Sequence, residues 1–398
     1  MTSPASKATQ AVRASIETDT QHGAVVPPLH LSSNFAFEGF GEKRQYDYTR
    51  SGNPTRDALA DALAKMEGGA GAVVTSSGMA ALTLLTQLLK PGDVIVAPHD
   101  CYGGTFRLFE QQSKKGLFEV RFVDQTDLQA LREACADRPA IILAETPSNP
   151  LLRIVDVAAI AEIASSCGAL LAVDNTFLSP ALQNPIELGA DLVIHSTTKY
   201  INGHSDVVGG CLVAATDELA EEIAYWANCI GITGAPFDSF MTLRGIRTLH
   251  PRIRQHEESA TLIARQLDEH SQVERVYYPG LEAHPGHEIA KRQQRGFGGM
   301  ISFELAGGED AVRIFVEHLR FFSLAESLGG VESLVCHPRS MTHAPVNDEA
   351  LAQAGIRPNL VRLSIGLESS EDLVADLLGA LEAASSLPAL KSVSAAYA

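Results

Sequence analysis

The middle of the chain alternates short apolar runs with helical stretches, and this alternation limits the possible folds more than any other feature. Each run is short, rich in β-branched residues and largely apolar on both faces, as expected for a strand that is covered on both sides. Helical stretches at 79–89, 126–136 and 156–166 separate several of these runs. The expected strands are 72–75, 94–97, 120–123, 141–144, 170–173, 192–195 and 211–214. This pattern predicts an α/β fold with a mostly parallel central sheet.

The chain is long enough for two domains, because its 398 residues exceed the usual size of one. Residues 1–58 lack sustained periodicity until a helix begins at about 56, and they are expected to form a tail or a docked arm. The strand-helix region then predicts a ligand-binding domain at 59–254. Residues 255–398 contain their own helices (255–269, 309–319, 370–385) and strands (273–278, 300–303, 360–364), which predicts a smaller α+β domain.

Composition excludes some functions. The formal net charge of −17 argues against nucleic acid or an anionic membrane as a partner. The six cysteines show no regular spacing and are interpreted as reduced thiols of a cytoplasmic protein. We find no apolar run of membrane-spanning length, no signal region at the N-terminus, and no spacing of histidines that predicts a metal site.

Reactive and helix-breaking residues follow the expected strands. In parallel sheets ligands bind beyond the carboxyl ends of the strands, so these residues are expected to share one edge. Lys199 follows the sixth strand together with Ser196 and Thr198, and Asp174 follows the fifth. Tyr102 follows the second strand on a glycine-flanked loop. The sequence therefore predicts an active site at this edge.

The same residues match the parts of one ligand. Ser77, Gly78 and Met79 begin a helix, which suits a phosphate, and Ser196 and Thr198 can add hydroxyl donors. Asp174 can keep an aromatic ring nitrogen protonated, Tyr102 can stack on the ring, and Lys199 can form a Schiff base with an aldehyde. Phosphate, pyridinium and aldehyde together describe pyridoxal 5′-phosphate (PLP). Each residue alone also has an ordinary interpretation, as a helix cap, a turn residue or a solvated lysine.

Five longer motifs carry a resemblance to a known family. The chain resembles the cystathionine synthase/lyase enzymes of the Cys/Met-metabolism family, which use PLP, from about residue 25 to residue 366. The motifs are Tyr48-Thr-Arg-Ser-Gly-Asn-Pro-Thr55, Ala97-Pro-His-Asp-Cys-Tyr-Gly-Gly104, Val173-Asp-Asn-Thr-Phe-Leu-Ser-Pro180, His195-Ser-Thr-Thr-Lys-Tyr200 and Leu324-Ala-Glu-Ser-Leu-Gly-Gly-Val-Glu-Ser333. The resemblance implies an aspartate-aminotransferase-like (type I) fold and a homotetramer built as a dimer of dimers with shared active sites.

The resemblance also implies roles for individual residues. The arm would bring Tyr48 and Arg50 to the PLP phosphate of the neighbouring subunit. Within one chain the same phosphate would be held by Gly78, Met79, Ser196 and Thr198. The ring would lie between Tyr102 and Asp174, and Lys199 would be the catalytic amine. Substrate and cofactor would be bound further by Asn149, Arg107, Glu326, Ser327 and Arg362, with Arg362 on the α-carboxylate of the substrate.

Within this family we expect γ-replacement, the γ-synthase reaction, in which L-cysteine displaces succinate from O-succinyl-L-homoserine to give L-cystathionine. Glu326 resembles an acid found in γ-acting members. The alternative is γ-elimination of cystathionine, a γ-lyase reaction, because Ser51 lies where γ-synthases often carry a second arginine. Arg107 is then the candidate for the distal carboxylate.

Two other classes of protein compete with a PLP enzyme as interpretations of this sequence. Ser196 and Lys199 match the SxxK pattern of penicillin-binding enzymes, but the sequence contains no KTG element and only a partial SDN element at Ser205. A binding module without catalysis would not explain why so many reactive groups gather at one edge.

Overall fold

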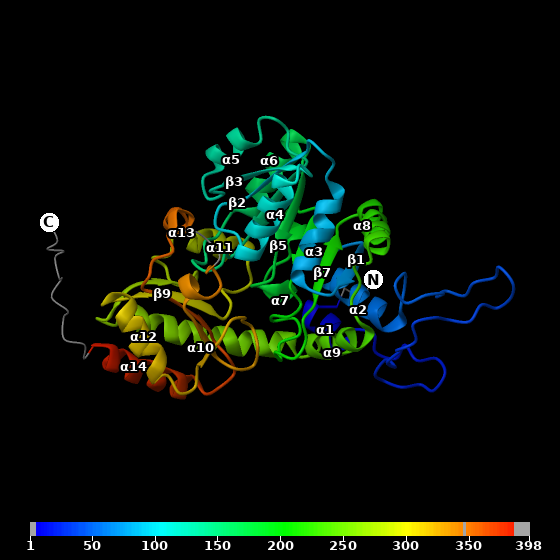
Figure 1. The fold of residues 1–398 in the computed structure, drawn as a ribbon. Helices are drawn as coiled ribbons and strands as arrows, with labels where there is room; N and C mark the ends of the chain where they lie inside the picture. Colours follow the sequence, from blue (N-terminus) through cyan, green and yellow to red (C-terminus); the bar gives the residue numbers. More distant parts are fainter. Residues whose placement is uncertain (1–4, 345–347, 386–398) are drawn as a thin grey trace.

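The structure is a computed structural model that describes residues 5–344 and 348–385. No helix in these ranges is long and apolar enough to cross a membrane. Two sheets, each with its own helices, make up most of the molecule, and an extended N-terminal segment projects from one side (Figure 1).

The larger sheet has seven strands in the order β1-β7-β6-β5-β4-β2-β3. Strand β7 pairs antiparallel with β1 and β6, and the other pairs are parallel. The prediction of a mostly parallel central sheet is therefore confirmed. The strands are β1 (Gly71–Thr75), β2 (Val94–Pro98), β3 (Glu119–Val123), β4 (Ile141–Glu145), β5 (Leu170–Asp174), β6 (Leu192–His195) and β7 (Gly210–Ala214).

Helices cover both faces of this sheet, which explains why its strands are apolar on both sides. Alternate residues of a strand point to opposite faces, so Leu212 packs toward one set of helices and Val213 toward the other. One face carries α3 (Gly78–Leu85), α4 (Gly103–Lys114) and α8 (Asp217–Ile230). The other carries α2 (Pro54–Glu67), α5 (Leu128–Ala134) and α6 (Val157–Cys167). Between these lie the short α7 (Ser179–Leu182) and the 3₁₀ helices η1 (Thr86–Leu88) and η2 (Pro185–Leu188).

The second sheet has five strands in the order β10-β11-β12-β9-β8. Its strands are β8 (Val273–Tyr277), β9 (Met300–Leu305), β10 (Ser323–Leu324), β11 (Leu334–Cys336) and β12 (Leu360–Ser364). A separate apolar core joins it to α10 (Leu249–Asp268), α12 (Gly308–His318) and α14 (Ser370–Ser385). The remaining elements are α11 (His287–Gln293), η3 (Pro338–Ser340) and α13 (Asp348–Ala354). The short β10 and β11 were not predicted.

Helix α10 links the two sheets (Figure 1). It packs against α1 (Lys7–Arg13) and α7 near its beginning, and against α14 and β8 further along. Helix α9 (Pro236–Ile246) precedes it and packs on α2. The expected boundary between residues 254 and 255 falls inside α10. The division into 59–254 and 255–398 stays a proposal.

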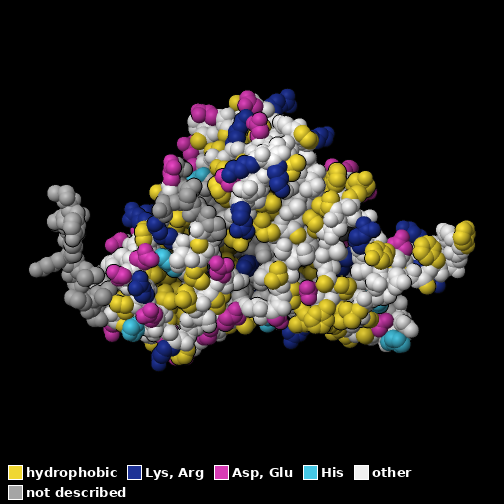
Figure 2. Space-filling view, viewed as in Figure 1, with side chains coloured by type: hydrophobic (Ala, Val, Ile, Leu, Met, Phe, Trp, Pro, Cys, Tyr) yellow, Lys and Arg dark blue, Asp and Glu magenta, His cyan; other side chains and the backbone are white. Residues whose placement is uncertain are grey.

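Residues 16–53 form an extended segment, here called the arm, that projects from the body beyond α2 (Figure 1). It contains only isolated bridges, such as the one between Asn34 and Tyr48. Large apolar side chains along it are exposed, among them Leu31 and Phe37, and Phe40 is fully exposed. Figure 2 shows apolar side chains gathered on this projection. Helix α1, which precedes the arm, was not predicted.

Candidate active site

A cavity of about 390 Å³ lies at the carboxyl ends of the parallel strands, as the topology rule for such sheets requires. Residues that follow β1, β2, β4, β5 and β6 meet there, and the second sheet closes it from the opposite side. Its wall includes the predicted residues Gly78, Met79, Tyr102, Asn149, Asp174, Ser196, Thr198, Lys199, Glu326, Ser327 and Arg362. The structure thus brings together residues that are far apart in the sequence, from Gly78 to Arg362.

Lys199 lies in the turn after β6, and its amine points to the second sheet. Its Nζ donates to Ser327 Oγ over 2.7 Å. Burial, together with the positive charge of Arg362, lowers the pKa of Lys199 from 10.5 to about 8. Near neutral pH the amine is therefore neutral far more often than the amine of an ordinary lysine, and nucleophilic and base chemistry require this neutral form. The bond to Ser327 does not suit the SxxK interpretation, which needs Lys199 to act on Ser196.

Arg362, on β12, is almost fully buried, with 2% of its surface exposed. Its Nη1 donates to Asn149 Oδ1 over 2.7 Å, and Nη2 donates to the Ser327 carbonyl over 2.9 Å. Its Nε is buried and has no hydrogen-bond partner among the described residues. Ser327 itself has a φ of 88°, which is unfavourable for a residue with a side chain. A guanidinium that is held rigidly and still has a free donor is suited to a carboxylate ligand.

Two carboxyl groups lie side by side at the ends of neighbouring strands, because Glu145 and Asp174 are register partners in the β4–β5 pair. Burial raises the pKa of Glu145 well above its usual range, and the charge of Asp174 raises it further. Burial also raises the pKa of Asp174, while hydrogen bonds from Thr176 oppose the rise. A protonated ring nitrogen beside Asp174 would favour its charged form. The pair therefore suits one ionised and one neutral carboxyl group.

The start of α3 forms the opposite end of the cavity. Ser77 caps the helix by accepting from the Ala80 N–H over 3.1 Å. The N–H groups of Gly78 and Met79 precede the hydrogen-bond ladder of the helix and are available to an anion. A side chain at Gly78 would collide with Ser196, since an added Cβ would lie 2.8 Å from the Ser196 Cβ. This close approach places the helix start beside the Ser196 hydroxyl.

Tyr102 precedes the first turn of α4 and is 42% exposed at the wall of the cavity. Its backbone N–H donates to Glu145 Oε2 over 2.9 Å. An added Cβ at Gly104 would lie 2.5 Å from the Tyr102 ring, so glycine is required there for the ring to take this position. The ring therefore lies at the cavity that Asp174 also lines and is available for stacking.

This donor set fits PLP: an anion-binding helix start, a carboxylate, an aromatic face and an amine with a lowered pKa line one cavity. A sequence model of the family described as Cys/Met metabolism PLP-dependent enzyme matches residues 8–382. The chain belongs to this family. It is a PLP-dependent enzyme.

Relatives in the family differ in reaction. The chain is 56% identical to cystathionine γ-synthase of Escherichia coli K12, over 95% of this chain and 98% of the relative. It is 47% identical to cystathionine γ-lyase of Dictyostelium discoideum, over 94% and 97%. A crystal structure of cystathionine γ-synthase from Xanthomonas oryzae pv. oryzae, in complex with aminoacrylate and cysteine, superposes with a TM-score of 0.95 at 60% identity, covering 96% of this chain and 99% of that one. The type I PLP fold expected from the sequence is confirmed.

Three predicted residues do not line the cavity of their own chain. Arg50 donates to the Asn228 carbonyl over 2.7 Å, and its guanidinium lies 5.8 Å from the centre of the Tyr48 ring. Tyr48 is 51% exposed on the arm. Arg107 is an exposed residue of α4. The hydroxyl of Ser51 is engaged within the arm itself, with the Tyr48 carbonyl at 2.8 Å.

The cavity wall also contains residues to which the sequence analysis gave no role. Glu145 is the clearest, and its position at the end of a strand was the signal that could have identified it. Thr176 was also identifiable, because it follows Asp174 by two residues. The others are Leu82, Pro147, Phe177, Val208, Leu328 and Thr342. Of these, Thr342 and Val208 follow no strand and carry no local signal.

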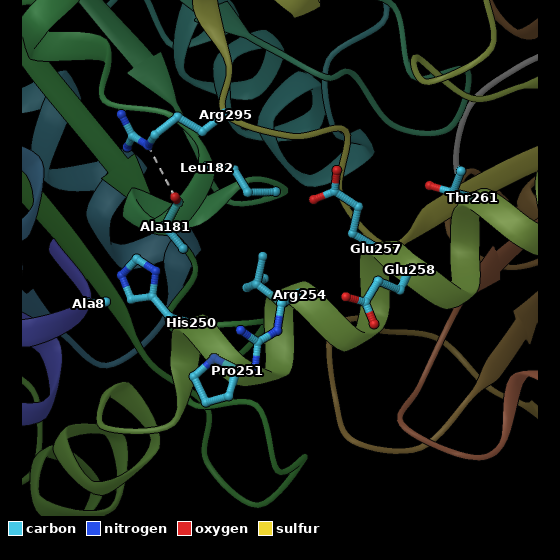
Figure 3. Close-up of a pocket in the computed structure, with 11 residues that line it drawn as sticks. Ala8, Ala181, Leu182, His250, Pro251, Arg254, Glu257, Glu258, Thr261 and Arg295 are labelled. Carbon is cyan, nitrogen blue, oxygen red and sulfur yellow. Dashed lines mark hydrogen bonds between the residues drawn. The ribbon is translucent and has the colours of Figure 1, made fainter. Parts of the chain in front are cut away.

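A second hollow, of about 850 Å³, runs along α10 beside α1 and α7 (Figure 3). None of the predicted site residues lines it. Its polar side chains connect neighbouring elements: Arg295 donates to the Ala181 carbonyl over 3.3 Å, and Glu257 accepts from the Phe297 N–H over 3.0 Å. These contacts give Arg295 and Glu257 structural roles.

Proposed function

We propose that this PLP enzyme is a cystathionine γ-synthase, which joins O-succinyl-L-homoserine and L-cysteine into L-cystathionine with release of succinate, on the route to methionine in the cytoplasm. The similarity to two γ-synthases supports this choice. The observation that carries it is this similarity, and the arrangement of Arg362, Ser327 and Lys199, which places a carboxylate-binding donor next to a reactive amine, supports an amino-acid substrate.

The substrate is positioned by Arg362. The α-carboxylate would accept from the free Nε–H and from a remaining Nη N–H in the plane of the guanidinium, while Asn149 and the Ser327 carbonyl each accept from one Nη. This binding directs the Cα–H toward the Lys199 amine. PLP, when bound, supplies an electron sink that makes the Cα and Cβ protons of the substrate acidic. Asp174 would hold the ring nitrogen in its protonated form, which this chemistry needs.

Proton movement is assigned to Lys199. Its neutral amine takes the proton from Cα and passes it to solvent, and the amine then takes a proton from Cβ before the Cγ–O bond breaks and succinate leaves with the bonding electron pair. The cysteine thiol loses its proton to solvent, and its thiolate forms the new bond to Cγ. The lysine ammonium then returns a proton to Cβ and, after taking another proton from solvent, to Cα. Ser327 orients the amine during these transfers, and we assign Glu326 and Tyr102 to shaping the position of the incoming cysteine. Effective positioning of this kind accounts for large differences in rate.

We further propose a homotetramer, a dimer of dimers, in which Tyr48 and Arg50 reach the phosphate site of the neighbouring subunit. Their position outside their own cavity supports this, as do the exposed apolar residues of the arm. In this homotetramer, Arg107 stays the candidate for binding the distal carboxylate of the substrate.

A paired assay tests the proposed reaction. We expect the kcat/KM for cystathionine formation from O-succinyl-L-homoserine and cysteine to exceed that for release of 2-oxobutanoate from cystathionine. Parallel assays with the O-acetyl ester identify the activating group. A higher kcat/KM for cystathionine cleavage would make the enzyme a γ-lyase and give weight to Ser51. The Lys199→Ala variant, which lacks the amine, serves as the blank for both reactions.

A further inference from the structure

A group of polar side chains lies buried behind the cavity, between α2 and the central sheet. It consists of Glu67, Asn175, Asn184 and His195, here called the Glu67 cluster. Glu67, Asn175 and His195 have no exposed surface, and Asn184 has 2%. None of the four lines the cavity, and the proposed chemistry uses none of them.

Glu67 accepts all the hydrogen bonds in this cluster. Its Oε1 lies 2.6 Å from His195 Nε2 and accepts from Asn175 Nδ2 over 2.9 Å. Its Oε2 accepts from Asn184 Nδ2 over 3.1 Å. His195 Nδ1 has no partner among the described residues, so the ring proton belongs on Nε2 and is donated to Glu67. A carboxyl group that accepts from three donors and donates to no acceptor fits the ionised form, the carboxylate.

The two donors on Oε1 come from the turns that carry cofactor-binding side chains. Asn175 directly follows Asp174, and His195 directly precedes Ser196. The turns are also joined on the cavity side, where Thr176 Oγ1 accepts from the Ser196 N–H over 2.9 Å. Asp174 and Ser196 serve opposite ends of PLP, the ring nitrogen and the phosphate.

We propose that Glu67 is a positioning residue for PLP. By binding Asn175 and His195 with one oxygen, it ties the end of β5 to the end of β6 from behind. It thereby fixes the separation of the two contact points that PLP must bridge. The inference depends on PLP binding, which the family establishes, and not on which reaction the enzyme carries out.

The competing interpretation is that Glu67 only attaches the end of α2 to the sheet. Asn184 can distinguish between the two interpretations. It donates to the same carboxylate but precedes η2 and contributes to neither cofactor-binding turn. It also donates to the Met66 carbonyl over 2.8 Å, which is a purely structural contact. Loss of Asn184 removes a hydrogen bond to Glu67 and leaves the link between the two turns intact.

The test compares purified holoenzymes of Glu67→Gln, Asn175→Ala and Asn184→Ala. The dissociation constant of PLP is measured by ultrafiltration, and the unfolding temperature is measured on the same samples. We expect Glu67→Gln, whose amide would face asparagine donors, and Asn175→Ala to weaken PLP binding by about tenfold, the effect of a buried hydrogen bond. Asn184→Ala should lower the unfolding temperature and leave PLP binding within about twofold.

Equal weakening of PLP binding in both asparagine variants would overturn the proposal, because affinity would then only follow stability. Wild-type affinity in Glu67→Gln or in Asn175→Ala would overturn it as well. If Glu67→Gln does not fold, the asparagine pair decides the question alone. The readout is cofactor binding, so a failure of the proposed γ-synthase reaction leaves the test valid.

Discussion

The cavity and the arm both contain predicted cofactor-binding residues. They differ in how far hydrogen bonds and packing within the same chain hold their side chains. In the cavity, Arg362 and Lys199 are held by short hydrogen bonds within one chain. On the arm, Tyr48 is half exposed and Phe40 contacts almost nothing. Exposed apolar groups of this size are costly unless another surface covers them. The difference supports the proposal that one chain builds most of the site and that the arm serves a neighbouring subunit.

The largest effect is expected at the centre of the cavity. Lys199→Ala removes the amine that moves the substrate proton, and we expect kcat to fall by roughly 10³-fold or more. Lys199→Arg keeps a charge but provides no neutral amine, so it should be equally inactive. Lys65→Ala, at an exposed position on α2, is the matched control and should keep full activity.

Chemical labelling checks the same residue independently. Borohydride reduction of the holoenzyme, followed by peptide mapping, should place a pyridoxyl group on Lys199. A label on another lysine would remove Lys199 from the centre of the mechanism.

The sequence alone identified the part of the site that follows from strand order. Asp174, Lys199 and Tyr102 each follow a strand, and the parallel sheet brings those strand ends together. Arg362 could not be placed in this way, because its position depends on how the second sheet packs through α10. It came from the resemblance alone. Glu67 ends an ordinary amphipathic helix, and no local pattern marks it as a buried acceptor.

An intermediate effect is expected from the arm. If Arg50 serves the neighbouring site, mixing Arg50→Ala subunits with Lys199→Ala subunits should restore about a quarter of the wild-type activity. Half of randomly formed two-fold dimers are mixed, and each of these holds one site with both residues intact. Activity is measured after subunit exchange has been shown by mass spectrometry.

The matched control for this experiment is a mixture of Arg50→Ala subunits with subunits that carry both substitutions. No site in that mixture has both residues, so its activity should stay at the level of the single variants. If the first mixture also stays at that level after exchange, Arg50 acts within its own chain and the contrast between arm and cavity is wrong.

The smallest expected effect concerns the pH at which Lys199 becomes reactive. Lysine reacts as the neutral amine, so reductive methylation at Lys199 in the cofactor-free protein should increase as pH rises through about 8, the lowered pKa. Arg362→Gln removes a positive charge that disfavours the ammonium form, so the pKa of Lys199 rises and the midpoint moves up, by roughly one unit.

Arg362→Lys keeps the charge and should leave the midpoint in place. Lys65→Ala, at an exposed position on α2, should also leave it unchanged. An unchanged midpoint in Arg362→Gln would assign the lowered pKa to burial alone, since burial is the larger of the two causes.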